Sequence, residues 1–298
     1  MRSALFLFAL LLGSAVFPVH ALSNTELYAV QMPAWVERAG QRAPARAGML
    51  LEQADTLETG TQGRMQIGLA DGSLLKLGEQ ARITLAELQP ADSPGGVFKG
   101  LLEVVKGAFR FTTGAFGRSQ QRDITLRVAS LTVGVRGTDL WGRSNDTADT
   151  VCLIDGSISV KHAQAADLVM DQPLQFVVAP HNAAPQPLAR IETDKLKRWA
   201  TETELESGAG VTLATGGWAV QLSAHANLDS AASAQQQMRQ AGYAAEVTQV
   251  QVQGKTYHRL RVVGFDTQAD AKAFASKIRG KFGAGSPWVT LEKVDVSQ

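Results

Sequence analysis

The sequence has little of what most catalytic, metal or nucleic-acid sites require. Cys152 is the only cysteine in 298 residues, so no internal disulfide can form. The five histidines are scattered and show no metal-binding spacing such as HExxH. Positive and negative charges nearly balance, at a net of +1, which gives no strongly basic surface for nucleic acid. We therefore expect no enzyme activity, no cofactor, no bound metal and no nucleic-acid partner.

Long apolar runs are also scarce, and the main one lies at the N-terminus. Arg2 precedes the apolar run 4–17, Pro18 ends that run, and Val19-His20-Ala21 offers small residues before a cleavage point. This pattern is typical of a secretory signal peptide over residues 1–21. The run is shorter than the roughly 20 residues that span a bilayer. It predicts an exported protein without a membrane span after signal removal, with an uncleaved anchor as the alternative.

Short strands dominate residues 28–162, where no helical period persists. Turns such as Asp71-Gly72-Ser73 separate alternating runs, and Asp155-Gly156 predicts a hairpin between residues 150–154 and 157–160. Cys152 lies within an apolar run and is expected to be buried. The pattern predicts an all-β domain.

Residues 163–216 are expected to link this domain to a second one. A strand is compatible with residues 176–178 and a helix with residues 188–205, where Trp199 is available to dock onto the β domain. The glycine-, alanine- and threonine-rich segment 207–217 predicts a flexible hinge.

The periodicity changes in residues 217–294. Alternation predicts a strand from Trp218, a helix from Leu228 to Ala241, and two β-branched strands at 245–252 and 257–263. A second helix begins at Thr267, and a final strand covers 288–294. The apolar stripe of that helix comprises Ala271, Phe274, Ala275, Ile278 and Phe282. The order β-α-β-β-α-β predicts a split βαβ fold, a four-stranded antiparallel sheet with both helices on one face.

Strand alternation also predicts which side chains lie on the open face of that sheet. The core set is Trp218, Val220, Leu222, Leu260 and Val262. The outward set is Gln221, Tyr257, Arg259 and Arg261. An aromatic ring, two guanidinium groups and an amide suit a polar polymer that contains rings. Dimerisation through this face is the competing interpretation, but it would bury unpaired guanidinium groups at a high cost.

The C-terminal stretch resembles a SPOR (sporulation-related repeat) domain. The resemblance rests on Val220-Gln221-Leu222, on Gly242-Tyr243, and on the run from Tyr257 to Val262. It implies binding of peptidoglycan glycan strands that have lost their stem peptides, with Gln221, Tyr257, Arg259 and Arg261 as glycan contacts. Two segments depart from the family pattern: Ser223-Ala224-His225 stands where Gly-Ser-Phe is usual, and Val263-Gly264-Phe265 where Gly-Pro-Phe is usual.

Residues 28–162 resemble a FecR-type domain, which implies a solenoid-like stack of short strands. The most specific motif is the run Val133–Thr138, with further matches at 60–61, 70–73, 106–110 and 151–160. We interpret Gly134, Arg136, Gly137 and Thr138 as a structural or partner motif. The favoured interpretation has Arg136 tying neighbouring turns together through backbone carbonyls, and the alternative is a partner contact. Named family members relay signals to sigma factors through a membrane span and a cytoplasmic segment, neither of which is expected here.

Together the two resemblances predict a periplasmic peptidoglycan-binding protein that is enriched at the septum during cell division. In this hypothesis the FecR-type domain is a protein-interaction module for a periplasmic or cell-envelope partner. The alternative is a periplasmic scaffold or signalling protein in which the FecR-type domain carries the main function.

Overall fold

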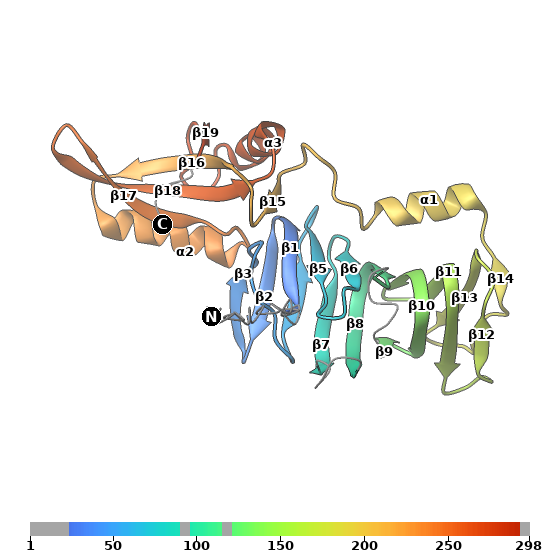
Figure 1. The fold of residues 1–298 in the computed structure, drawn as a ribbon. Coiled ribbons are helices and arrows are strands. Elements are labelled where there is room, and N and C mark those ends of the chain that lie inside the picture. The colour runs from blue at the N-terminus through green and yellow to red at the C-terminus, as the bar shows by residue number, and fades with distance from the viewer. Residues whose placement is uncertain (1–23, 90–95, 115–120, 293–298) are drawn as a thin grey trace, which may run out of the picture.

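The computed structural model describes residues 24–89, 96–114 and 121–292, and the predicted signal peptide lies outside these ranges. Figure 1 shows the strands β1 to β14 side by side in a long β domain, with an α+β unit above the end that carries β1 to β3. The helix α1 (Thr193–Thr201) and the strand β15 (Val211–Leu213) lead the chain back along the β domain to that unit. No helix within the described ranges is long and apolar enough to cross a membrane.

The β domain is built from two groups of paired strands that share their longest members. The bounds are β1 (Glu26–Gln31), β2 (Ala34–Arg38), β3 (Gln41–Pro44), β4 (Thr56–Thr59), β5 (Arg64–Gly68), β6 (Leu74–Leu77), β7 (Arg82–Gln89), β8 (Val97–Thr112), β9 (Gln121–Val128), β10 (Leu131–Ser144), β11 (Ala148–His162), β12 (Leu168–Met170), β13 (Gln175–Pro180) and β14 (Ala189–Arg190). One group pairs in the order β1-β5-β6-β8-β10-β11-β13-β14. The other pairs in the order β3-β2-β4-β7-β8-β9-β10-β11-β12.

The three shared strands pass from one group to the other at glycines with positive φ. Gly107 in β8, Gly137 in β10 and Gly156 in β11 have φ values of 90°, 61° and 90°. A Cβ atom on Gly156 would lie 2.1 Å from the carbonyl oxygen of Gly137, so these two bends pack directly on each other. The expected hairpin at Asp155-Gly156 is therefore wrong: β11 continues through this dipeptide and bends there. A strand bend and a hairpin turn both require a glycine with positive φ, so the local sequence at Asp155-Gly156 does not distinguish them.

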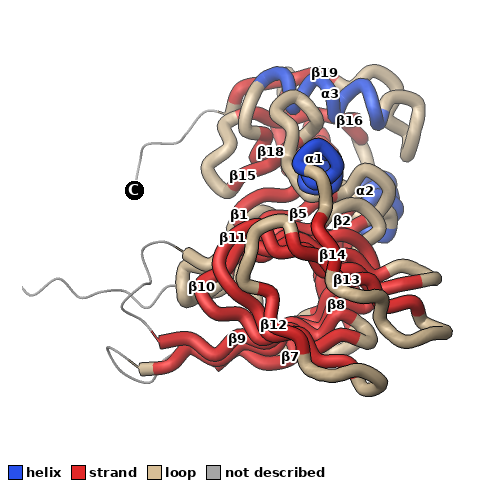
Figure 2. The backbone as a smooth tube through the Cα atoms, turned by 90° about the vertical axis from the view of Figure 1, so that its right-hand side faces the viewer, coloured by secondary structure: helices blue, strands red, loops and turns tan. Residues whose placement is uncertain are grey.

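The strands surround an apolar core, and Figure 2 views the β domain along its length. Its fully buried members include Phe98, Phe109 and Phe111 from β8, with Val133 from β10. Cys152 is completely buried, and burial raises the pKa of its thiol to about 12, so it stays a protonated apolar side chain.

The segment expected to be a linker belongs largely to the β domain, because β12, β13 and β14 all pair within it. Within the stretch where a helix was expected, α1 is shorter, at Thr193–Thr201. Trp199 of this helix stacks on Trp141 of β10 with 4.6 Å between ring centroids. This aromatic pair fixes the helix to the end of the β domain.

The C-terminal unit contains β16 (Trp218–His225), α2 (Leu228–Gln240), β17 (Glu246–Val252), β18 (Lys255–Phe265), α3 (Gln268–Ile278) and β19 (Trp288–Leu291). Its strands pair antiparallel in the order β17-β18-β16-β19. Both helices contact β16 and β18, where Val220, Leu260 and Val262 are fully buried. The helix α3 ends at Ile278, so Phe282 lies beyond it and instead packs edge-on against Tyr243.

The segment predicted to be a flexible hinge is an ordered connection between the two parts. Its strand β15 pairs with β1 along Val211–Leu213 and meets β18 at Thr212. The buried carboxylate of Asp270 accepts three backbone N–H groups through Oδ1, from Gly208, Gly210 and Val211, at 2.9–3.0 Å. Composition indicated flexibility because it could not show that Asp270, about sixty residues further on, would bind the glycine amides.

Further contacts join the two parts around β15. The backbone N–H of Ala34 donates to the carbonyl of Gly242 at 3.0 Å, and the indole N–H of Trp35 donates to the carbonyl of Gln240 at 3.2 Å. The ammonium of Lys277 donates to the carbonyl of Met32 at 3.1 Å. The two domains therefore share a bonded interface that fixes their relative orientation.

We predict that Asp270→Ala releases the segment 207–213. The variant leaves three backbone N–H groups and the hydroxyl of Thr267 without their acceptor, which should cost about 2–4 kcal/mol of unfolding free energy. Denaturant unfolding and limited proteolysis measure the change, with new cleavage expected between residues 207 and 217. The exposed Asp266→Ala is the matched control, and equal protease resistance in wild type and Asp270→Ala would refute the anchoring role.

The same carboxylate predicts a pH dependence. Burial would raise the pKa of Asp270, but the hydrogen bonds from Thr267 and from the three backbone amides outweigh it and leave the pKa below the usual 3.8. Because the folded state holds this group ionised, its stabilising contribution is present above pH 3.8 and is lost as pH falls through the lowered pKa. Unfolding curves measured from pH 6 downwards should therefore fall less steeply below pH 4 for Asp270→Ala than for wild type.

Candidate functional site

The open face of the C-terminal sheet carries a row of polar and aromatic residues, one from each strand. Strand register places Glu246 of β17 opposite Arg261 of β18, Arg261 opposite Gln221 of β16, and Gln221 opposite Trp288 of β19. Neighbouring strands lie about 4.8 Å apart, so the row spans roughly 14 Å. Tyr257 and Arg259 lie further along β18 on the same face, since they alternate with the buried Leu260 and Val262.

The expected solvent exposure of Gln221 is wrong. Its side chain faces the predicted side of the sheet, but the residue is only 5% exposed. The long side chains of its cross-strand neighbours, Arg261 and Trp288, flank it. Alternation along one strand predicts which face of the sheet a side chain lies on. It does not predict whether side chains of the neighbouring strands cover that side chain. Gln221 is therefore a half-enclosed member of the row, and replacing it would affect packing as well as any ligand.

The two arginines of this face differ in their partners. Arg261 donates from Nε to Glu246 at 2.9 Å and from Nη1 to Glu292 at 2.8 Å, so its charge is balanced by two carboxylates. Arg259 is half-exposed and has no side-chain hydrogen bond or ion pair among the described residues. Its cross-strand neighbours are the small residues Ala224 and Thr248. Arg259 is thus a cation on this face whose donors are available to a ligand.

Trp288 is the functional candidate that the sequence analysis missed. It was treated only as the start of the last strand, yet it is 52% exposed and lies beside Gln221 in the row. A large exposed indole on a sheet face offers an apolar surface on which a sugar ring can stack. The sequence shows a tryptophan at the start of the last strand, which could have indicated a ligand contact. The face of the sheet on which this tryptophan lies depends on the register of β19 against β16.

The β domain contributes to this face through one ion pair. Arg46 lies 3.6 Å from Oε2 of Glu246 and donates to the carbonyl of Ala245 at 3.4 Å. Glu246 therefore bridges an arginine of the β domain and Arg261 of the sheet face. This arrangement ties the position of Arg261 to the docking of the two domains.

Among the described residues, the motif arginine of the β domain makes no contact of the kind expected for a structural tie between turns. Arg136 is exposed, and its side chain makes no hydrogen bond or ion pair with another described residue. Gly137 forms the bend of β10, and Thr138 donates to the carbonyl of Ser157 at 2.7 Å. Gly134 lies in β10 between Thr125 and Ser159.

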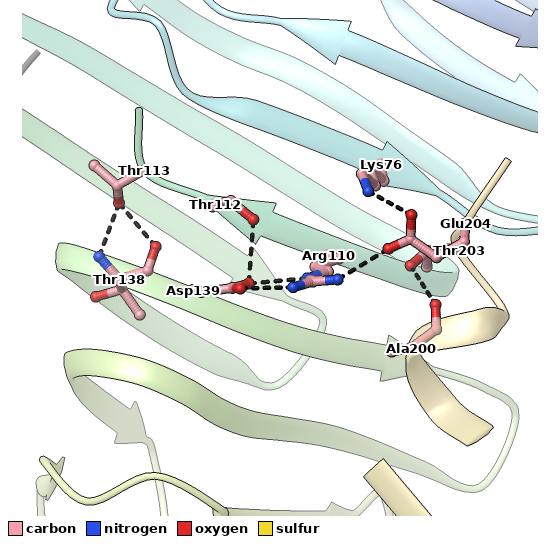
Figure 3. A network of polar contacts seen from close by, with 9 residues as sticks. All are labelled: Lys76, Arg110, Thr112, Thr113, Thr138, Asp139, Ala200, Thr203 and Glu204. Carbon is pink, nitrogen blue, oxygen red and sulfur yellow. Dashed lines mark hydrogen bonds and ion pairs between the residues drawn. The ribbon is translucent and has the colours of Figure 1, made fainter. Parts of the chain in front are cut away.

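Arg110 is the arginine that ties neighbouring strands together, as Figure 3 shows. It binds Asp139 with two hydrogen bonds, of 3.0 Å from Nε and 2.7 Å from Nη2, and donates to Glu204 at 2.9 Å. Lys76 also donates to Glu204, at 2.5 Å. These contacts link β6, β8 and β10 to the segment after α1. Periodicity could not distinguish the two arginines, because each lies in a strand that bends at a glycine, Gly107 in β8 and Gly137 in β10.

Comparison with known proteins supports the division into two domain types. Residues 214–290 match the SPOR domain model, and residues 55–159 match the FecR protein model. The chain therefore combines a FecR domain with a SPOR domain. A SPOR domain implies peptidoglycan binding, proteins that carry it are typically periplasmic or associated with the envelope, and both families are binding or signalling domains. No curated protein matches the sequence.

Two crystal structures of a protein from Parabacteroides distasonis ATCC 8503, whose suggested role is that of an anti-sigma factor, show a distant likeness. The first is 14% identical, has a TM-score of 0.39, and is aligned over 49% of this chain and 64% of its own. The second is 13% identical, has a TM-score of 0.40, and is aligned over 80% of this chain and 98% of its own.

We predict that Arg110→Ala destabilises the β domain and that Arg136→Ala does not. Arg110→Ala leaves Asp139, which is 17% exposed, without its paired guanidinium, and should cost about 1.5–3 kcal/mol. Arg136→Ala removes an exposed side chain without a partner and should change stability by less than about 0.5 kcal/mol. Denaturant unfolding of both variants tests this, and a larger loss in Arg136→Ala than in Arg110→Ala would overturn the assignment.

Proposed function

We propose that the protein binds peptidoglycan glycan strands stripped of stem peptides through the open face of its SPOR domain. The observation that carries the proposal is the juxtaposition of the exposed Trp288 with Gln221 and Arg261 in one row, with the unpaired Arg259 alongside. Sugars present C–H faces that stack on aromatic rings, and hydroxyl and acetamido oxygens that accept hydrogen bonds. Denuded strands expose these groups without the bulk and charge of the peptides.

Each residue has a role that follows from its surroundings. Trp288 supplies the stacking surface at one edge, and Tyr257 supplies a second ring further along the face. Arg259 donates directly to sugar oxygens, because no protein group occupies its donors. Gln221 and Arg261 form the floor between them, with Arg261 oriented by Glu246 and Glu292.

We further propose that the mature protein is periplasmic and concentrates at the division septum, where denuded strands arise during cell separation. The winding of β1 to β14 around one core supports a solenoid-like form for the FecR domain. The exposed Arg136 favours a second role in this domain, as an interaction module for a periplasmic or envelope partner. A scaffold or signalling role would place the main function on that contact.

We predict that Trp288→Ala and Arg259→Ala each weaken binding to sacculi by roughly tenfold to a hundredfold. The measurement is co-sedimentation with purified sacculi before and after an amidase removes the stem peptides, with circular dichroism of each variant. Arg239→Ala, an exposed arginine on α2, is the matched control and should bind as wild type does. Gln221→Ala is expected to lower stability as well, since this residue is enclosed.

Two results would contradict the proposal. Full binding by a folded Trp288→Ala/Arg259→Ala double variant would move the site to another surface. Equal binding before and after amidase treatment would show that denuded strands are not the preferred ligand. Septal enrichment is tested separately by comparing the localisation of fluorescent fusions of wild type and the double variant.

A further inference from the structure

A second candidate site lies on the β domain, away from the open face of the sheet. A groove of about 800 Å³ runs along the turns that follow β4 and β6, the bend of β8 and the turn between β10 and β11. Trp35 of β2 lines this groove and also a neighbouring hollow of about 530 Å³ that extends to α2. The indole of Trp35 is therefore a wall shared by two connected depressions at the domain boundary.

The groove contains charges that the protein itself leaves unpaired. Arg64 and Lys106 have no side-chain hydrogen bond or ion pair with another described residue, although both line the groove. Asp146 likewise has no such partner, and Glu79 accepts only the backbone N–H of Gln62, at 2.7 Å. By contrast Glu58, on the same wall, is paired with Arg42 and Arg82. Two cations and two carboxylates are thus available to a ligand.

Two buried donors add to this set. The Nε atoms of Arg64 and Arg143 are buried and have no hydrogen-bond partner among the described residues. Arg143 is fixed by its ion pair with Glu202 at 2.8 Å and by its position 4.9 Å from the ring centre of Trp141. Burial raises the pKa of Glu202, and nearby Glu79 adds to this effect, whereas Arg143 and the charge of Arg64 oppose it. Buried donors without an acceptor are unfavourable unless something else contacts them.

The charges of the groove favour some classes of ligand over others. Uncharged sugars would leave the charges of Arg64, Lys106, Glu79 and Asp146 without a partner. Nucleic acids and other polyphosphates would be repelled by Glu79, Asp146 and Glu202. A peptide that carries both carboxylates and amines complements both signs.

We propose that this groove binds a short peptide bearing both carboxylate and ammonium groups. Its carboxylates pair with Arg64 and Lys106, and its ammonium groups pair with Glu79 and Asp146. The proposal does not depend on glycan binding, because it involves a different domain and different side chains.

The test uses the full mature chain and three synthetic probes. The first is the tetrapeptide Ala-Glu-Lys-Ala with free termini, the second is its carboxylate-only form with an acetylated N-terminus and norleucine for lysine, and the third is a fully neutral form. Binding is followed by NMR through the indole N–H signal of Trp35, assigned with Trp35→Phe. We expect the first probe to bind, the second to bind less tightly, and the third not to bind.

Matched variants connect the binding to the groove. Lys106→Ala and Arg64→Met should weaken binding of the first probe about tenfold, and added salt should weaken it in wild type. Lys99→Ala is the control, because Lys99 is an exposed lysine on the same strand, outside the groove. Lys106 is exposed on β8, so its variant is expected to fold even if Arg64→Met does not.

Three outcomes would overturn the proposal: no change of the Trp35 signal in wild type, equal binding of the neutral probe, or equal weakening by Lys99→Ala and Lys106→Ala. Sacculi binding by the same variants separates the two sites. Lys106→Ala should bind amidase-treated sacculi normally, and Trp288→Ala should bind the tetrapeptide normally.

Discussion

The buried carboxylate of Asp270 is the contact on which the arrangement of the two domains depends. It accepts the hydroxyl of Thr267, the residue that caps α3 of the SPOR domain, and also accepts three backbone N–H groups from the segment that precedes β15. Those bonds hold β15 where it can pair with β1 on one side and meet β18 on the other. One acidic side chain thus turns a glycine-rich connection into an ordered part of both domains.

Charge balance explains why chemically similar residues on these surfaces have different roles. Arg261 and Arg110 are each held by two carboxylates and serve to fix strands in position. Arg259, Arg136, Arg64 and Lys106 lack such partners among the described residues and are available to ligands. An arginine that is already paired offers a ligand little new hydrogen bonding, whereas an unpaired one gains charge-assisted bonds on binding.

Local sequence patterns predicted the elements better than their contacts. In the C-terminal stretch, the spacing of apolar residues predicted both helices and the buried face of β18. These features depend only on residues that are close in the sequence. The enclosure of Gln221, the exposure of Trp288 and the pairing of Arg110 depend on strand register across long sequence separations. For the same reason, composition suggested a hinge where the structure has β15, and a hairpin where Gly156 bends a continuous strand.

The strand β15 covers what would otherwise be an open edge of the β domain. The strand β1 pairs with β5 on one side and with β15 on the other, so both of its sides are hydrogen-bonded within the chain. A chain that ended before residue 211 would present the N–H and C=O groups of Ala29–Gln31 as an open sheet edge. Open edges template pairing with other chains, so a FecR domain that lacked β15 would be prone to self-association. The ordered connection therefore also protects the FecR domain from aggregation, whatever ligand the SPOR domain binds.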